Sequence, residues 1–188
     1  MQRLTIVQQY SIKFSVLFLL MIASCAGPNA EFLSPNTDLP KLKVVVLPFS
    51  NLTTTPDAGK AVTEIFLSEL QIRHPFSLLP LPKGIILSRT RSTGPEDSLP
   101  PDIRARIQAM TGADAALTGT VTEFEYRVGG TTRPVSALSW TLLSLRTGRI
   151  LWAANASRMG SCFWSCRKTL SGLTKDLVDE KIRELGIH

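Results

Sequence analysis

A short run of apolar residues without a polar face is the feature that most restricts how this chain folds. Residues 43–49 read Lys-Val-Val-Val-Leu-Pro-Phe, so β-branched and aromatic side chains point to both sides of an extended segment. A strand with two apolar faces has to be covered on both of them. We therefore expect an interior strand with helices on each side, which is the arrangement of an α/β domain.

The rest of the chain alternates between strand and helix patterns. Apolar residues recur at helical spacing in residues 57–72, 101–112 and 170–185, and strand patterns occupy residues 76–81, 115–128, 135–145 and 149–156. Together with the first strand, these segments follow the order β-α-β-α-β-β-β-α. This order predicts a single-domain α/β fold, a three-layer sandwich with a mixed sheet.

The long strand over residues 115–128 changes phase partway along. Leu117 and Val121 lie on one side of it, whereas Phe124 and Tyr126 have the opposite parity. A residue that breaks the alternation in this way marks either a β-bulge near Thr122-Glu123 or a switch of the buried face. The sequence leaves both readings open.

Composition argues against an enzyme and against a nucleic-acid partner. Of 188 residues, 44% are hydrophobic, and the formal charge of +6 is not gathered into Lys/Arg clusters. The chain has only two histidines, and His74 precedes a helix-ending proline, so no catalytic triad can be proposed. We expect no cofactor, no metal and no catalytic residue. Trp140 and Trp152 lie within apolar strands, where core packing is the expected role.

The N-terminus has the pattern of a secretory signal. Arg3 and Lys13 provide positive charge, residues 14–22 form an apolar run, and Ala23-Ser24 supply the small residues that precede a cleavage site. The run is about half of the roughly 20 residues that a membrane-spanning helix needs. Residues 1–24 are therefore expected to be a signal peptide.

The signal ends in a sequence that resembles the lipobox of bacterial lipoproteins, Ile22-Ala23-Ser24-Cys25. The resemblance implies that Cys25 is diacylated on sulfur and acylated on its new amino group, with palmitate among the expected chains. Two or three such chains anchor a protein stably. Ala26 replaces the aspartate of the inner-membrane retention signal, which implies the outer membrane, on its periplasmic face.

Residues 25–40 are expected to be the lipidated cysteine and a tether, with the folded domain in residues 41–188. The tether contains Pro28, Pro35 and Pro40 and has no sustained apolar period. Its fifteen residues after the cysteine span at most about 50 Å, so the domain works close to its membrane. Cleavage before Cys25 removes Arg3 and Lys13 and no acid, which lowers the charge from +6 to +4.

Four blocks of the domain resemble the periplasmic lipoproteins of the CsgG and PelC type. They are residues 44–53 (VVVLPFSNLT), Ala58-Gly59 at a helix start, residues 112–124 (GADAALTGTVTEF) and residues 147–152 (TGRILW). The resemblance covers residues 43–185. The stretch Glu123–Arg127 and the turn at Gly129-Gly130 look most like PelC, the lipoproteins of Pel exopolysaccharide export.

This resemblance implies a non-enzymatic role in polysaccharide export for biofilm formation. PelC-like proteins form a homo-oligomeric ring, with a dodecamer as a candidate size, beneath the outer-membrane β-barrel through which the polymer leaves. The implied partners are outer-membrane lipid, the barrel and the exopolysaccharide. PelC-like proteins usually carry acidic residues in the turn after the long strand, whereas residues 129–133 here contain none and add Arg133.

Two alternative functions belong to relatives with the same fold. A CsgG-like secretion channel would need membrane strands of about 9–11 alternating residues, and residues 83–100 are broken by Gly84, Gly94 and Pro95. An LpoB-like regulator of a cell-wall synthase would need a longer tether than residues 26–40.

The loop before the last helix departs from the PelC pattern, because its aromatic pair lies between cysteines, Cys162-Phe163-Trp164-Ser165-Cys166. In the oxidising periplasm these cysteines are expected to pair with each other, with two reduced thiols as the alternative. A disulfide would hold Phe163 and Trp164 outward. With Arg167 and Lys168 beside them, they are expected to face the membrane. Packing into the core is the alternative for the aromatic pair.

Overall fold

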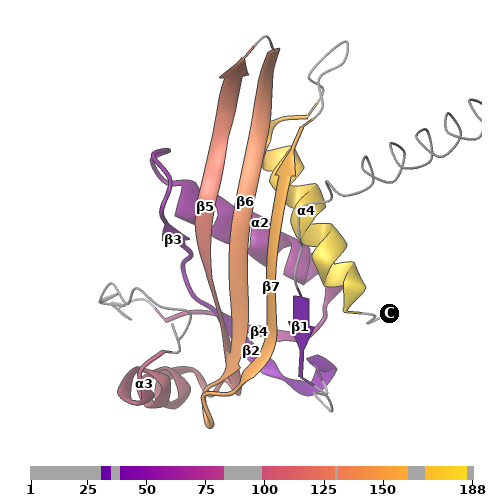
Figure 1. The fold of residues 1–188 in the computed structure, drawn as a ribbon. Coiled ribbons are helices and arrows are strands. Elements are labelled where there is room, and N and C mark those ends of the chain that lie inside the picture. The colour runs from indigo at the N-terminus through magenta and orange to yellow at the C-terminus, as the bar shows by residue number, and fades with distance from the viewer. Residues whose placement is uncertain (1–30, 35–38, 83–98, 130, 161–167, 186–188) are drawn as a thin grey trace, which may run out of the picture.

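The computed structural model describes residues 31–34, 39–82, 99–129, 131–160 and 168–185. The elements, in chain order, are β1 (Glu31–Leu33), η1 (Leu39–Lys41), β2 (Lys43–Val46), β3 (Ser50–Asn51), α2 (Ala58–Arg73), β4 (Ser77–Leu79), α3 (Pro101–Thr111), β5 (Ala115–Gly129), β6 (Thr131–Ser144), β7 (Ile150–Met159) and α4 (Leu170–Glu184). Every described element therefore lies between residues 31 and 184 (Figure 1).

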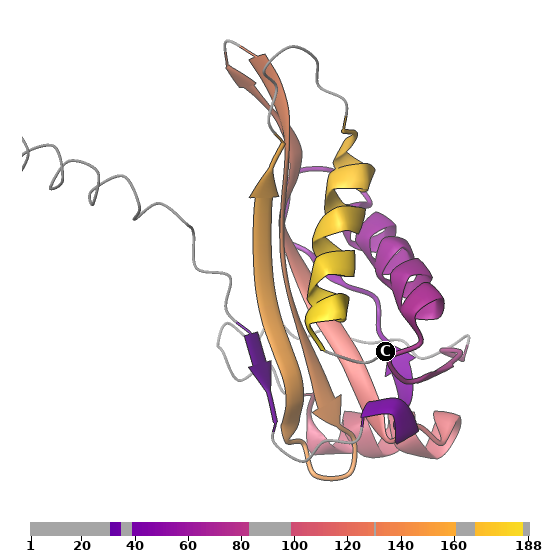
Figure 2. The ribbon, with the colours of Figure 1, turned by 90° about the vertical axis from the view of Figure 1, so that its right-hand side faces the viewer.

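The strands form one mixed sheet in the order β1-β7-β6-β5-β2-β4, and β3 also pairs with β5. Strand β2 is parallel to both β4 and β5, whereas β5, β6 and β7 are antiparallel to one another. Helices α2 and α4 cover one face of the sheet, and α3 packs on the other face at one end (Figures 1 and 2). The predicted α/β class and the three layers are confirmed.

Strand β2 lies in the interior of the sheet, as its two apolar faces predict. Val44 and Val46 belong to the core under α2 and α4, whereas Val45 and Leu47 belong to the core under α3. All four side chains are buried. The run Lys43–Phe49 therefore joins the two helical layers through the sheet.

A chain of aromatic rings forms the centre of the larger core. Phe49 contacts Phe66 of α2 at 5.1 Å between ring centroids, Phe66 contacts Trp140 at 5.1 Å, and Trp140 contacts Trp152 at 5.5 Å. The last two contacts are edge-to-face, an arrangement that aromatic quadrupoles favour. Trp140 and Trp152 are buried, so their predicted role in core packing is confirmed.

The phase change in β5 is a β-bulge. The pairing of β5 with β6 shifts register between Val121 and Glu123. Phe124, two residues past the shift, is buried in the same core as Leu117 and Val121. The bulge therefore keeps β5 facing α2 and α4, and the alternative reading, a switch of the buried face, is wrong.

Part of the expected tether is a strand of the sheet. Glu31–Leu33 form β1, which pairs antiparallel with Trp152–Ala154 of β7. Leu39, in η1, is buried in the main core. Ordered structure therefore begins before residue 41.

Candidate functional site

The β5–β6 hairpin extends past α2 and α4 and forms an arm at one end of the domain (Figure 1). We call residues 124–136 the arm. On its helix-facing side, Tyr126 is 49% exposed and Val128 is 87% exposed. The Tyr126 hydroxyl accepts the backbone N–H of Leu170, which fixes the start of α4 against the base of the arm.

On the other side of β5, one arginine pairs with two acids. The Arg127 guanidinium lies 2.6 Å from a Glu123 carboxylate oxygen and 3.5 Å from one of Glu125. All three side chains are partly exposed to solvent, so these ion pairs contribute at most about 1 kcal/mol each. The arm therefore carries no acidic patch among its described residues.

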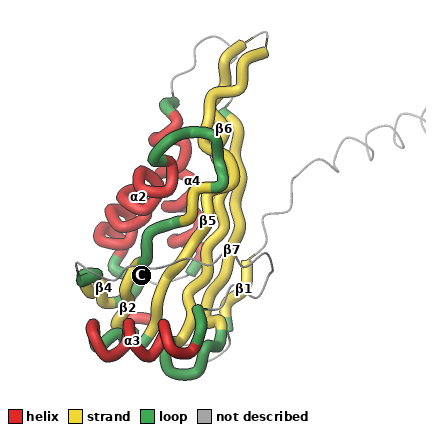
Figure 3. The backbone as a smooth tube through the Cα atoms, turned by 90° about the vertical axis from the view of Figure 1, so that its left-hand side faces the viewer, coloured by secondary structure: helices red, strands yellow, loops and turns green. Residues whose placement is uncertain are grey.

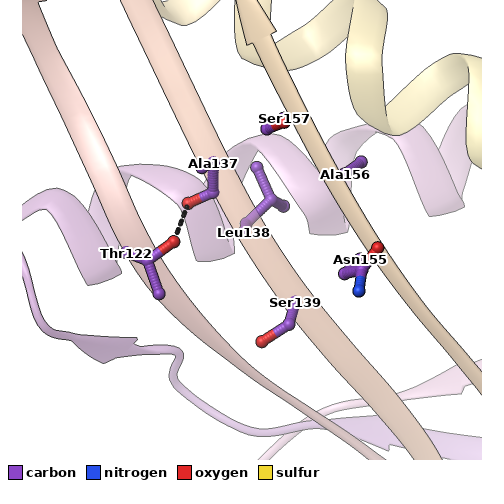
Figure 4. Close-up of a pocket in the computed structure, with 7 residues that line it drawn as sticks. All are labelled: Thr122, Ala137, Leu138, Ser139, Asn155, Ala156 and Ser157. Atoms are coloured by element: carbon purple, nitrogen blue, oxygen red, sulfur yellow. Dashed lines mark hydrogen bonds between the residues drawn. The ribbon is translucent and has the colours of Figure 1, made fainter. Parts of the chain in front are cut away.

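The sheet face opposite α2 and α4 holds a shallow pocket of about 250 Å³ beside the bulge (Figure 4). It crosses the three long strands, and its lining residues are Thr122, Ala137, Leu138, Ser139, Asn155, Ala156 and Ser157. The Thr122 hydroxyl donates to the Ala137 carbonyl oxygen at 3.1 Å. Hydroxyl and amide groups at this pocket can exchange hydrogen bonds with a hydroxylated ligand, and its lining includes no ionisable side chain.

No group of three metal-ligating side chains occurs among the described residues. Within the same residues, no helix is long and apolar enough to cross a bilayer.

The Glu31 carboxyl lies where β1 meets β7 and α4, and it contacts both Trp152 and Lys181. It accepts Trp152 Nε1–H at 2.8 Å and lies 3.9 Å from Lys181 Nζ, which also pairs with Glu184. Burial raises the pKa of Glu31, although the Trp152 hydrogen bond and the Lys181 charge act to lower it. The hydrogen bond from Lys181 lowers the pKa of Glu184. This cluster attaches β1 to β7 and α4.

These opposite shifts predict opposite pH effects on stability. The pKa of Glu31 is higher in the folded state than in the unfolded state, so ionised Glu31 opposes folding. The stabilisation that is present while Glu31 is protonated is lost as pH rises through the raised pKa. Glu31→Gln, whose amide oxygen can still accept from Trp152, should therefore gain stability relative to wild type between about pH 4 and pH 7. Glu184→Gln should lose relative stability over the same range, because the Glu184 stabilisation is present above its ordinary pKa and lost as pH falls. Denaturant unfolding at several pH values measures both, and two curves parallel to wild type would contradict the assignment.

Most of the predicted site residues lie outside the described residues. These are Cys25, Cys162, Phe163, Trp164, Cys166 and Arg167. Lys168 is exposed just before α4 and pairs with Asp176. The lipid anchor, the disulfide and the membrane-facing loop therefore stay predictions.

Three of the four blocks that carry the resemblance meet at Phe49. A Cβ on Gly59 would lie 2.4 Å from the Phe49 carbonyl oxygen, and a Cβ on Gly119 would lie 2.4 Å from the Phe49 ring. Both approaches are too close for any side chain. These motif residues therefore report how α2 and β5 pack on residue 49, not a binding site.

Sequence reasoning missed two features of the surface. The pocket depends on the register of β5, β6 and β7, and no local pattern encodes it. The Glu31–Trp152 contact joins residues far apart in the chain. The apolar pair Phe32-Leu33 within a polar tether was the one available signal for β1.

The layers and topology define a single α/β domain with a mixed, helix-covered sheet. Its particular fold is PelC-like: the PelC dodecamer from Paraburkholderia phytofirmans matches with a TM-score of 0.62 at 20% identity, over 86% of this chain and 98% of that chain. Lipoprotein GNA1162 from Neisseria meningitidis matches with a TM-score of 0.53 at 18% identity, over 77% of this chain and 98% of that chain. No protein-family model and no curated protein sequence matches the chain.

Proposed function

We propose that this protein is a non-enzymatic outer-membrane lipoprotein whose copies form a periplasmic ring that guides an exopolysaccharide to an outer-membrane export barrel. The observation that carries the proposal is the likeness to the PelC dodecamer, which spans 98% of that chain. The same shape, in a chain with a lipobox-like Cys25, supports the same kind of assembly on the same membrane.

The surface of the domain supports a guiding role better than a catalytic one. The open face of β5, β6 and β7 presents hydroxyl and amide side chains around the pocket, at Thr122, Ser139, Asn155 and Ser157 (Figure 4). Such groups form weak, exchangeable hydrogen bonds with sugar hydroxyls. A polymer in transit has to be held weakly, so that it can move on.

The direction of β1 supports an orientation of the domain on the membrane. Because β1 is antiparallel to β7, the chain enters it from the side where β7 ends at Met159 (Figure 2). Cys25 precedes Glu31 by six residues, which span at most about 20 Å. Glu31 pairs with Ala154, and the five steps from there to Met159 cover about 17 Å. A lipid on Cys25 can therefore reach the level of Met159, where β7 ends.

This orientation places exposed apolar residues at the bilayer. Tyr126 and Val128 of the arm and Met159 of β7 are exposed hydrophobic residues near the end of the sheet where β7 ends. The loop with Phe163 and Trp164 follows Met159 directly in the chain. The position of Met159 supports Phe163, Trp164, Arg167 and Lys168, which come soon after it in the chain, as the proposed membrane-facing residues.

Self-association is the first test. A ring is the simplest closed assembly that identical subunits form around a channel. The soluble chain of residues 26–188, which contains every described element, should sediment as an oligomer or show a mass that rises with concentration. A strict monomer at high concentration, also with lipid vesicles present, would refute the ring.

Membrane contact by the loop is the second test. Trp164→Ala should weaken the binding of residues 26–188 to anionic vesicles. The variant removes the indole ring from the headgroup layer, and the basic residues beside it then lose the group that holds them at the interface. Ile72→Ala, at an exposed apolar residue of α2, is the control and should bind as wild type does. Alkylation before and after reduction reports whether Cys162 and Cys166 are paired. Unchanged vesicle binding by Trp164→Ala would place the membrane contact elsewhere.

A further inference from the structure

Basic side chains gather at the end of the domain opposite the arm. Lys43 begins β2, Arg104 and Arg106 lie on α3, and Arg146 and Arg149 lie in the β6–β7 connection. Figure 1 shows α3 and the β6–β7 connection together at this end. We call these five residues the basic end.

Hydrogen bonds join the elements that carry the basic end, α3, β2 and the β6–β7 connection, which also lie together in Figure 3. Arg104 Nε donates to the Leu99 carbonyl oxygen at 3.0 Å, and Arg104 Nη1 lies 2.6 Å from where a Cβ on Gly148 would be. Gly148 has a φ of +73°, a conformation that favours glycine in the connection. The Asp114 backbone N–H donates to the Lys43 carbonyl oxygen at 2.8 Å. The basic groups are therefore carried on fixed backbone.

No carboxylate of the described residues forms an ion pair with any of these five side chains. In contrast, carboxylates pair with basic residues over the rest of the described surface, namely with Arg73, Arg127, Arg158, Lys168, Lys175, Lys181 and Arg183. Among the described residues, the acids at the basic end are Asp102 and Asp114, and the Asp114 carboxylate accepts the backbone N–H of Lys43. Positive charge is therefore concentrated here, and Lys43, Arg106, Arg146 and Arg149 are exposed.

We propose that the basic end binds the carboxylates of an anionic polysaccharide, which makes a uronate-containing polymer the substrate class of the export ring. This inference rests on the proposed function. The direction of β1 puts the basic end on the side away from the bilayer, where a polymer arrives from the periplasm. Within the arm, Arg127 and Arg133 outnumber Glu125, so the arm offers no competing acidic surface for a cationic polymer.

The chemistry of the side chains fits this ligand. Guanidinium groups bind carboxylates through paired hydrogen bonds, which an ammonium group cannot reproduce. A single exposed contact contributes little, about 1 kcal/mol or less. A ring repeats the same surface in every subunit, so a chain of regularly spaced carboxylates can engage several subunits at once, and avidity raises the overall affinity.

Binding of defined oligosaccharides to residues 26–188 tests the proposal. We expect alginate oligosaccharides to bind, neutral dextran and cationic chitosan oligosaccharides not to bind, and the alginate affinity to fall as salt rises. Arg146→Glu should weaken alginate binding about tenfold or more, because a charge reversal both removes an attraction and adds a repulsion. Lys60→Glu, an exposed residue of α2, makes the same change in net charge and should bind as wild type does.

The outcomes separate this proposal from the ring itself. Sedimentation of the same samples reports assembly, so an oligomer that ignores alginate, or binds chitosan instead, overturns the basic end as a polymer site. Equal losses in Arg146→Glu and Lys60→Glu would show a general charge effect and also overturn it. If the wild-type chain binds anionic vesicles and Arg146→Glu abolishes that binding, the basic end is a lipid-binding surface instead.

Discussion

Trp152→Ala is expected to cost about 3–5 kcal/mol of folding free energy, a large part of the 5–15 kcal/mol that stabilises a typical domain. The side chain is fully buried, packs edge-to-face on Trp140 and donates to Glu31. Its loss leaves a cavity beside the rings and removes the donor that holds β1. Denaturant unfolding followed by circular dichroism measures the change. A loss below about 1 kcal/mol would contradict the packing.

Paired phenylalanine variants separate the hydrogen bond from the packing. Trp152→Phe and Trp140→Phe remove the same atoms, but Trp140 Nε1 has no hydrogen-bond partner among the described residues, whereas Trp152 Nε1 donates to Glu31. Trp152→Phe should therefore cost about 1–2 kcal/mol more, because it leaves a half-buried carboxylate without its donor. Equal costs for the two variants would mean that the Glu31 contact adds nothing to stability.

The core was predictable because each of its signals is local. The two-faced run at residues 43–49 and the helical spacing of α2 and α4 depend on near neighbours in the chain, and they set the layers. The parity change around Thr122 marked the bulge, although only the partner strand could decide between a bulge and a switch of faces. The sequence pattern therefore located the core, but the choice between a bulge and a switch of faces needed the pairing of β5 with β6.

The surface was less predictable because it depends on pairing between distant residues. The three residues of β1 are too few to show a strand period. They form a strand because they pair with the edge of β7 and because Glu31 accepts the Trp152 hydrogen bond. The basic end is likewise spread over β2, α3 and the β6–β7 connection, and no local cluster of Lys or Arg announces it. A chain of moderate net charge can thus carry a positively charged surface, because seven other basic residues of the described part of the chain pair with carboxylates.

Cys25→Ser is expected to remove the protein from the outer membrane. A serine hydroxyl cannot form the thioether that holds the diacylglycerol, and without acylation the lipoprotein signal is not processed. Each buried methylene contributes about 0.8 kcal/mol, so the loss of two or three chains abolishes stable anchoring. Fractionation should then show a soluble species, or a precursor that retains residues 1–24, in place of the outer-membrane form.

Intact mass decides between these products, because the wild-type chain should begin at residue 25 with acyl chains attached. Cys162→Ser and Cys166→Ser are the matched controls: each removes one thiol from the loop after β7 and should leave the acylated mass and the outer-membrane fraction unchanged. If Cys25→Ser stays in the outer membrane with the wild-type mass, the lipid is not on Cys25. The direction of β1 would then no longer orient the domain on the membrane, and neither the arm would be expected at the bilayer nor the basic end away from it.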